Sequence, residues 1–194
     1  MAPSLTALFV GLAAADATLA ASERHKARRF TKPLLMPTLL VGKPRPVQRA
    51  LALGGVGDVA LLGKGQLAFT AGLGSFLAGH LAWIAALRPS SAGVIAQRPA
   101  TTAPYLAAWA GLNAYLWPRT GRNRLPVLVY STALLGTALA ALDTGEPAVA
   151  AGGALFLASD TLLALDRFAG VRLPLHEGFV MTMYTSGQAL LART

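Results

Sequence analysis

The sequence predicts an all-α fold, a polytopic membrane helix bundle of about eight transmembrane helices, from three observations. Apolar residues make up 54% of the chain and charged residues only 13%. The mean hydropathy is +0.52. The apolar residues form long runs separated by short basic clusters, which is typical of a helical membrane protein. The 194 residues leave no room for a sizeable soluble domain, so we expect one integral membrane domain over residues 1–194.

The length of each apolar run can be compared with the bilayer. A helix needs about 20 mainly apolar residues to cross a hydrocarbon core of roughly 30 Å. Runs that approach this length are the expected spans, at residues 4–21, 31–44, 48–62, 66–87, 100–117, 125–142, 147–165 and 174–192.

The first two runs differ in how well they fit a membrane-spanning helix. No Lys or Arg precedes the first run, so the basic region of a secretory signal is missing, and we interpret this run as the first membrane helix. The second run is short and contains Pro33 and Pro37. It crosses the bilayer only if Lys32 and Lys43 snorkel to the two interfaces.

Later runs carry isolated polar residues. The third run contains Asp58, the fourth His80, the fifth Asn113 and the seventh Asp160, whereas the sixth has no charged residue. A charged side chain in hydrocarbon costs several kcal/mol, so an intramembrane acid indicates a functional site. One face of the eighth run carries residues at helical spacing, namely Glu177, Met181, Tyr184 and Gln188.

Lys and Arg lie between the apolar runs rather than along one helix face, which favours bilayer anchoring over a nucleic-acid partner. With eight spans, the loops after odd-numbered runs hold eleven of the 17 basic residues, and the other side holds six. The positive-inside rule then predicts that both termini lie outside the cytoplasm, and we expect the protein in the cell (plasma) membrane. A re-entrant second segment would overturn this count.

The polar residues are expected to converge on one leaflet. The odd-numbered helices run in one direction, and the last third of each contains a polar residue; the eighth helix runs the other way and has polar residues in its first two turns. A polar, water-accessible pocket open to one leaflet would satisfy all these groups together. The residues expected at this depth are Asp16, Asp58, Asn113, Asp160, Tyr184 and Gln188.

Structural roles are the alternative for these residues. Asp58 or Asp160 could bond to a neighbouring helix and only fix packing. His80 fits a structural hydrogen bond as well as a catalytic role. Tyr184 and Gln188 could join helices, as polar side chains commonly do in membrane bundles.

Four segments, in chain order, carry a family resemblance: 57–62 (GDVALL), 74–83 (GSFLAGHLAW), 153–168 (GALFLASDTLLALDRF) and 180–188 (VMTMYTSGQ). Together they resemble the YhhN family of lysoplasmalogenase-like membrane proteins. Lys32-Pro33-Leu34 is similar to the family's start of helix two. The resemblance implies about eight helices and hydrolysis of the vinyl ether bond of lysoplasmalogens. The products would be a fatty aldehyde and a glycerophospho-head group, and the expected partners are a lysophospholipid substrate and membrane lipids.

The residues fit this chemistry. A vinyl ether hydrolyses by slow protonation of an alkene carbon, which gives an oxocarbenium ion that water captures. Glycosidases use one carboxylic acid and one carboxylate at a transition state that resembles an oxocarbenium ion. We hypothesise that Asp58 and Asp160 share one proton, and that one donates it while the other stabilises the cation. The residues expected to position water or the ether oxygen are His80, Tyr184, Gln188, Asn113 and Asp16; those expected to meet the lipid phosphate are Lys32, Arg28 and Arg29.

This chemistry needs only acid and water, so no cofactor is implied. No metal site is predicted either, because the chain has no cysteine and His25, His80 and His176 are far apart in sequence and expected depth. An alternative is a small transporter or lipid-binding membrane protein whose acids bind a proton or cation. The Gly-Asp and Ser-Asp segments, about a hundred residues apart, hint at the internal repeat that transporters often have.

Overall fold

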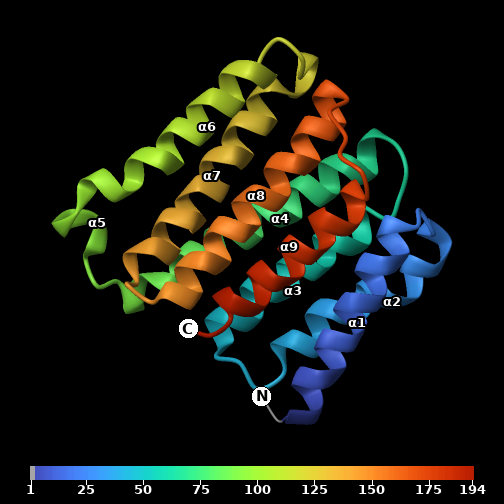
Figure 1. The fold of residues 1–194 in the computed structure, drawn as a ribbon, viewed down its shortest axis with the longest axis horizontal. Coiled ribbons are helices and arrows are strands. Elements are labelled where there is room, and N and C mark those ends of the chain that lie inside the picture. The colour runs from blue at the N-terminus through green and yellow to red at the C-terminus, as the bar shows by residue number, and fades with distance from the viewer. Residues whose placement is uncertain (1–2) are drawn as a thin grey trace.

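The computed structural model describes residues 3–194, which are helical apart from their connections and contain no strand. Nine α-helices follow one another in this range, with α5 a single turn and three short 3-10 turns in the connections (Figure 1). The bounds are α1 Pro3–Ala21, α2 His25–Leu40, α3 Arg45–Ala60, α4 Gln66–Leu87, α5 Val94–Gln97, α6 Ala103–Leu116, α7 Arg124–Asp143, α8 Pro147–Ala169 and α9 His176–Leu191.

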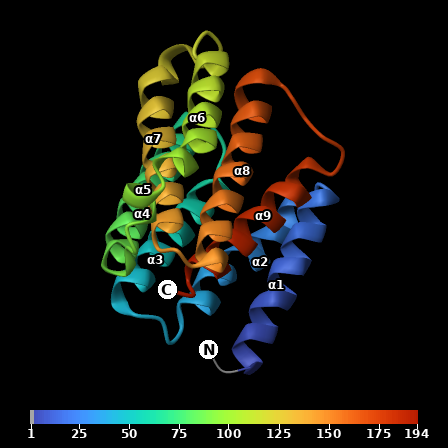
Figure 2. The same cartoon turned by 60° about the vertical axis from the view of Figure 1, so that its left-hand side comes forward.

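Seven of the helices described close into a ring. Neighbours around it are α1, α2, α3, α4, α7, α8 and α9, and α9 returns to pack on α1. Helix α6 lies outside the ring, against α7 (Figures 1 and 2). The side chains inside the ring therefore come from segments that are distant in the sequence.

Four helices in the described range are long and apolar enough to cross a membrane, namely α1, α4, α7 and α8. Helices α2, α3 and α9 have 16 residues each and α6 has 14, which is below the usual spanning length. The expectation of an all-helical membrane protein is confirmed. The expectation that eight helices cross the bilayer is not.

Several helix boundaries differ from the expected runs. Helix α2 begins at His25 rather than at residue 31, so the basic cluster is helical and Arg28 faces the protein interior. A 3-10 turn, Pro99–Thr102, replaces the start of the fifth run. Helix α8 continues to Ala169, four residues beyond the expected end.

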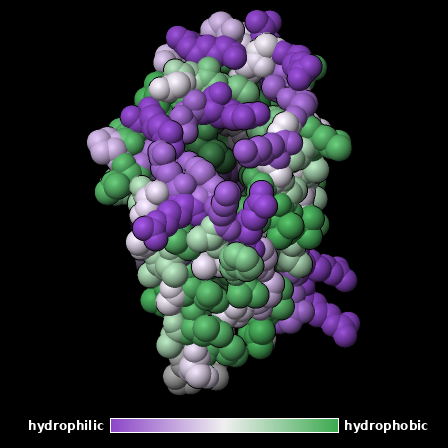
Figure 3. Space-filling view, turned by 90° about the vertical axis from the view of Figure 1, so that its right-hand side faces the viewer, coloured by the Kyte–Doolittle hydropathy of each residue, from purple (hydrophilic) through white to green (hydrophobic). Residues whose placement is uncertain are grey.

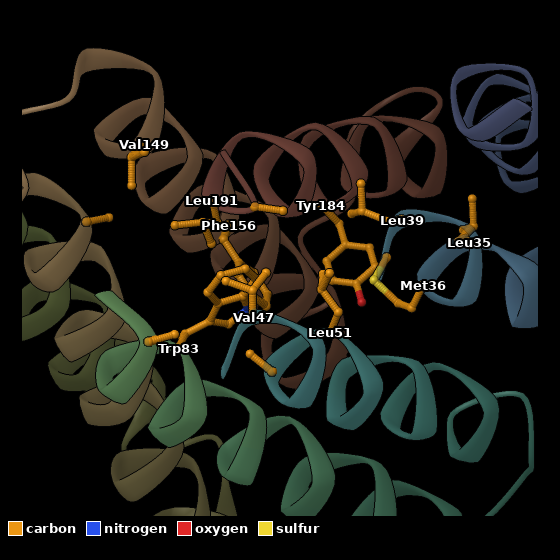
Figure 4. Close-up of a cluster of buried hydrophobic side chains, with 14 of the residues drawn as sticks. Leu35, Met36, Leu39, Val47, Leu51, Trp83, Val149, Phe156, Tyr184 and Leu191 are labelled. Carbon is orange, nitrogen blue, oxygen red and sulfur yellow. The ribbon is translucent and has the colours of Figure 1, made fainter. Parts of the chain in front are cut away.

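The packed core fills one end of the ring. Leu35, Met36, Leu51, Trp83 and Phe156 are almost wholly buried there. They come from α2, α3, α4 and α8, and Tyr184 of α9 lies among them (Figure 4). The core leaves the opposite end of the ring to polar side chains, and the candidate site lies at that end.

Glycines let the ring close tightly between α8 and α9. A Cβ built on Gly152 would lie 2.8 Å from the Leu191 backbone nitrogen and 2.9 Å from the Gly187 carbonyl oxygen. A Cβ on Gly187 would lie 3.0 Å from the Gly152 carbonyl oxygen. Backbone contact through small residues is a common way for membrane helices to pack. Here it fixes the position of α9, which brings Tyr184 inward.

Candidate active site

A cavity of about 540 Å³ enters the ring from the polar end. Its outer wall includes His25, the 63–65 connection, Arg167 and Glu177, so it opens where the α1–α2, α3–α4 and α8–α9 connections lie. Figure 3 shows this face, where hydrophilic side chains gather around a hollow above a mostly apolar surface. Both aspartates predicted to be catalytic, Asp58 and Asp160, line the same cavity.

Asp58 lies deep in the cavity and is held by groups from two other helices. Its side chain is 2% exposed, and its Oδ1 lies 3.2 Å from the Lys32 ammonium nitrogen. The Tyr184 hydroxyl donates a hydrogen bond of 2.8 Å to Oδ2. The neighbouring Gly57 packs directly on Phe76, because a Cβ there would lie 2.6 Å from the Phe76 ring. Asp58 is therefore an ion-paired carboxylate in a fixed position.

Asp160 has a neutral partner. The Tyr130 hydroxyl donates to its Oδ2, and no Lys, Arg or His within residues 3–194 forms an ion pair with it. The preceding Ser159 is buried and also lines the cavity, and its hydroxyl has no hydrogen-bond partner in the described part of the chain. One oxygen of Asp160 and the Ser159 hydroxyl thus remain for a ligand.

His80 lies behind Tyr130 rather than in the cavity wall. Its Nε2 is 3.2 Å from the Tyr130 hydroxyl oxygen and its Nδ1 is 3.1 Å from the Thr137 hydroxyl oxygen. Because Tyr130 gives its proton to Asp160, its oxygen accepts from Nε2–H, and Nδ1 accepts from Thr137. These bonds fix the neutral tautomer and form a chain of donors that ends on Asp160.

A second ionic cluster ties α1, α2 and α9 together at the cavity rim. Asp16 is fully buried and accepts from Arg28, with Nη2 to Oδ2 at 3.2 Å, and from the Thr31 hydroxyl at 2.7 Å. Arg28 also donates to Glu177 at 3.1 Å. Arg28 and Glu177 line the cavity whereas Asp16 does not. Asp16 therefore acts on the cavity through Arg28.

Two residues expected near the acids lie elsewhere. Gln188 accepts a hydrogen bond from the Trp83 indole at 3.1 Å and is buried below the cavity. Asn113 donates to the Trp109 carbonyl and accepts from Ser131 on the α6–α7 contact. Neither lines the cavity. Their polar groups satisfy helix packing, which was the structural alternative for such residues.

Three predicted phosphate contacts have different surroundings. Lys32 and Arg28 line the cavity, but each is engaged by a carboxylate at 3.2 Å. Arg29 is exposed and does not line the cavity.

Tyr130 and Ser159 were not predicted as site residues. A tyrosine in an apolar run is common, and nothing in the sequence indicates that its hydroxyl meets an acid 30 residues later. For Ser159, its place directly before Asp160 is the feature of the sequence that could have indicated a site residue.

The sequence matches the profile of the YhhN family over residues 27–194. The chain belongs to the YhhN family. The matched range includes Lys32, Asp58, Tyr130 and Asp160 but leaves out Asp16. The resemblance in the four segments is therefore confirmed.

Curated relatives of this YhhN-family chain carry one name. A protein named Lysoplasmalogenase from Mycobacterium bovis is 37% identical over 126 residues, which covers 61% of this chain and 48% of the relative. A protein of the same name from Mycobacterium tuberculosis matches to the same extent. The chain thus spans about half the length of the curated relatives it matches. No solved structure matches it.

Proposed function

We propose that this protein is a membrane-embedded hydrolase that cleaves the vinyl ether bond of lysoplasmalogen-type lysophospholipids. The products are a fatty aldehyde and a glycerophospho-head group. One observation carries the proposal: two carboxyl groups from α3 and α8 line a single cavity, and only one of them has a cationic partner. The name of the curated relatives supports the substrate class.

The reaction needs an acid and an anion at once. Asp58 supplies the anion, because the Lys32 ammonium beside it stabilises the carboxylate. Asp160 supplies the acid. Asp160 is half-buried among apolar helices and has no cationic partner in the described part of the chain, so a neutral carboxyl group avoids a desolvation cost there. Tyr130 occupies one of its oxygens as a donor, which leaves the other to carry the proton.

The proton balance is complete with these two groups and water. Asp160 gives its proton to the alkene carbon that is not bonded to oxygen. The adjacent carbon, which is bonded to the ether oxygen, then becomes the cationic carbon of an oxocarbenium ion. The Asp58 carboxylate stabilises this cation. Water then attacks the cationic carbon and returns one proton to Asp160, which gives a neutral hemiacetal. The hemiacetal breaks its bond to the glycerol oxygen, and its hydroxyl proton passes to that oxygen, so the products are aldehyde and alcohol. This division resembles the two carboxyl groups of glycoside hydrolysis.

The cavity also offers an apolar wall for the hydrocarbon chain. Leu73, Phe76, Val127, Val180 and Met181 line it beside the acids. Lipid-binding cavities are mainly apolar with a few polar groups that fix orientation. The alkenyl chain packs on this wall, and the head group faces the open polar end.

Aldehyde release by purified protein in detergent tests the proposal. Asp58→Asn and Asp160→Asn should each lower turnover by at least about a hundredfold, the usual contribution of a positioned acid or base. Glu146→Gln, an exposed acid in the α7–α8 connection, is the control and should keep normal turnover. Size-exclusion profiles and melting temperatures show which variants are folded.

Two outcomes would contradict the proposal in different ways. Near-normal turnover by a folded Asp58→Asn or Asp160→Asn variant would refute the two-acid mechanism. If folded wild-type protein releases no aldehyde, the assignment of lysoplasmalogens as the substrate class would be refuted.

A further inference from the structure

We infer that Lys64 and Arg167 form a phosphate-binding subsite at the cavity mouth, where they hold the phosphate of the lipid head group. The inference rests on the proposed function, which brings a lysophospholipid into this cavity. Both residues line the cavity, Lys64 from the α3–α4 connection and Arg167 from the last turn of α8. Both side chains are exposed.

These two cations differ from the others around the cavity because they have no acidic partner within residues 3–194. Lys32 is paired with Asp58, and Arg28 is paired with Asp16 and Glu177. A phosphate at Lys32 or Arg28 would have to displace a carboxylate. At Lys64 and Arg167 a phosphate would meet positive charge that no acid in the described range neutralises.

The acid next to Arg167 in the sequence does not neutralise it. Asp166 Oδ2 lies 3.9 Å from Arg172 Nε and 3.9 Å from His176 Nε2, on the side of the α8–α9 connection. Arg167 instead places its guanidinium carbon 4.5 Å from the centroid of the Phe69 ring. Stacking on an aromatic face holds a guanidinium group by its plane and leaves its N–H edge free for a bidentate phosphate contact.

The spacing along α8 suits the length of the substrate. Arg167 and Asp160 are seven residues apart, so they share one face and are separated by a rise of about 10.5 Å. The Cα–Cβ bonds of a helix tilt toward its N-terminus, which is the direction of Asp160 from Arg167. The vinyl ether oxygen and the phosphorus are about five bonds apart, roughly 6 Å when extended. A phosphate at Arg167 therefore leaves the vinyl ether near the acid.

The test measures binding separately from hydrolysis. A lysophosphatidylethanolamine with an ester-linked chain has the phosphate but no vinyl ether, and a monoacylglycerol of the same chain lacks the phosphate. Calorimetry in detergent gives the affinity of each lipid for wild-type protein, Lys64→Gln, Arg167→Gln and the double variant. The controls are Lys26→Gln and Arg122→Gln, exposed cations that do not line the cavity.

We expect the double variant to bind the phosphorylated lipid about tenfold more weakly, since charged hydrogen bonds of this kind are worth at least that factor. Affinity for the monoacylglycerol should stay unchanged, and both controls should match wild type. In turnover assays on a lysoplasmalogen, KM should rise by a similar factor while kcat stays within about twofold. Substitutions of exposed side chains are not expected to unfold the protein.

Each failure has its own signature. Equal affinity of wild type and double variant for the phosphorylated lipid would overturn the subsite, even if aldehyde is released normally. A phosphate preference that the double variant loses, without any aldehyde release by wild type, would leave the subsite in place and overturn the proposed reaction. In a third arm inorganic phosphate replaces the lipid. Tight binding of inorganic phosphate, lost in the double variant, with no preference for the phosphorylated lipid would overturn the assignment to a head group.

Discussion

Asp58 and Asp160 line one cavity, but Asp58 has a cationic partner and Asp160 a neutral one. Asp58 forms an ion pair with the Lys32 ammonium at 3.2 Å and accepts a hydrogen bond of 2.8 Å from the Tyr184 hydroxyl, whereas Asp160 accepts from the neutral Tyr130 hydroxyl. This difference in partners assigns the roles of anion and acid to the two groups. In this account the position of one lysine decides which aspartate is which.

The Lys32–Asp58 pair gives a prediction about stability and activity. In Lys32→Met the buried Asp58 loses its cation, so the free energy of unfolding should fall by about 3–5 kcal/mol. The double variant Lys32→Met with Asp58→Asn should regain most of this stability, because no buried charge is left unpaired, and it should remain inactive. Denaturation in detergent and aldehyde release measure the two effects. A Lys32→Met protein as stable as wild type would rule out the pair.

Tyr130 gives a prediction about rate. Tyr130→Phe removes the donor to Asp160 and leaves His80 Nε2 without its partner. One lost donor of this kind corresponds to a decrease in kcat of roughly ten- to a hundredfold, with little change in KM. Tyr115→Phe on α6, whose side chain does not line the cavity, is the control. An unchanged kcat in Tyr130→Phe would mean that the Tyr130 hydroxyl plays no part in holding Asp160.

The acids were predictable from the sequence and their partners were not. Asp58 and Asp160 stand out because few carboxylates occur in apolar runs. Tyr130 does not stand out, since its role depends on how α7 packs against α8. Asn113 and Gln188 have the right depth, but rotation about the helix axis turns them toward α7 and Trp83, and depth alone does not fix that rotation.

At the level of elements, α9 connects the core to the site. It packs on α8 through Gly152 and Gly187, and on α1, where a Cβ on Gly178 would lie 2.8 Å from the Ala21 Cβ. From this position its Tyr184 reaches Asp58 and its Glu177 reaches Arg28. A small shift of α9 would therefore change both ionic clusters.

Gly152→Ala tests this connection. The new methyl group would meet backbone atoms of α9 at under 3 Å, which cannot move independently, so overpacking should destabilise the protein by about 1–3 kcal/mol and lower turnover. Gly74→Ala on α4 is the matched control, because a Cβ there has nothing within 4 Å. Its greater helix propensity should leave stability equal or slightly higher. Equal melting temperatures for Gly152→Ala and wild type would refute the close α8–α9 contact.

The helix positions followed from the apolar runs, but several helix ends did not, and two of these ends have a structural reason. The basic cluster before residue 31 has the composition of an interface anchor, yet it is helical because Arg28 turns inward to Asp16. That contact joins two helices and leaves no local signal. Helix α8 continues past Asp166 and Arg167 because its polar end lines the cavity mouth instead of lying in hydrocarbon.

At the scale of the whole molecule, the ring formed within residues 3–194 encloses a cavity that opens at the polar end of the bundle. The α1–α2, α3–α4 and α8–α9 connections at that end follow odd-numbered apolar runs of the sequence. Eleven of the 17 basic residues lie in or beside the connections that follow odd-numbered runs. The positive-inside rule therefore predicts that the cavity opens toward the cytoplasm. Substrate would then enter from the cytoplasmic leaflet.

Single cysteines test this orientation, since the chain has none of its own. Ser90→Cys lies at the end opposite the cavity mouth and Lys26→Cys at the mouth end, and both positions are exposed. In right-side-out membrane vesicles, an impermeant thiol reagent should label Ser90→Cys directly and Lys26→Cys only after permeabilisation. The reverse pattern would place the mouth on the outer side.

The central claim is that an acid in this cavity protonates the alkene carbon of a vinyl ether. The most direct test is hydrolysis of a lysoplasmalogen in D₂O. The aldehyde is reduced at once to the alcohol, and the mass of the alcohol is measured by mass spectrometry. The account predicts one deuterium on the carbon next to the former carbonyl in the wild-type product, and at least about a hundredfold less product from Asp160→Asn. Aldehyde released without that deuterium, or labelled aldehyde released normally by Asp160→Asn, would contradict it.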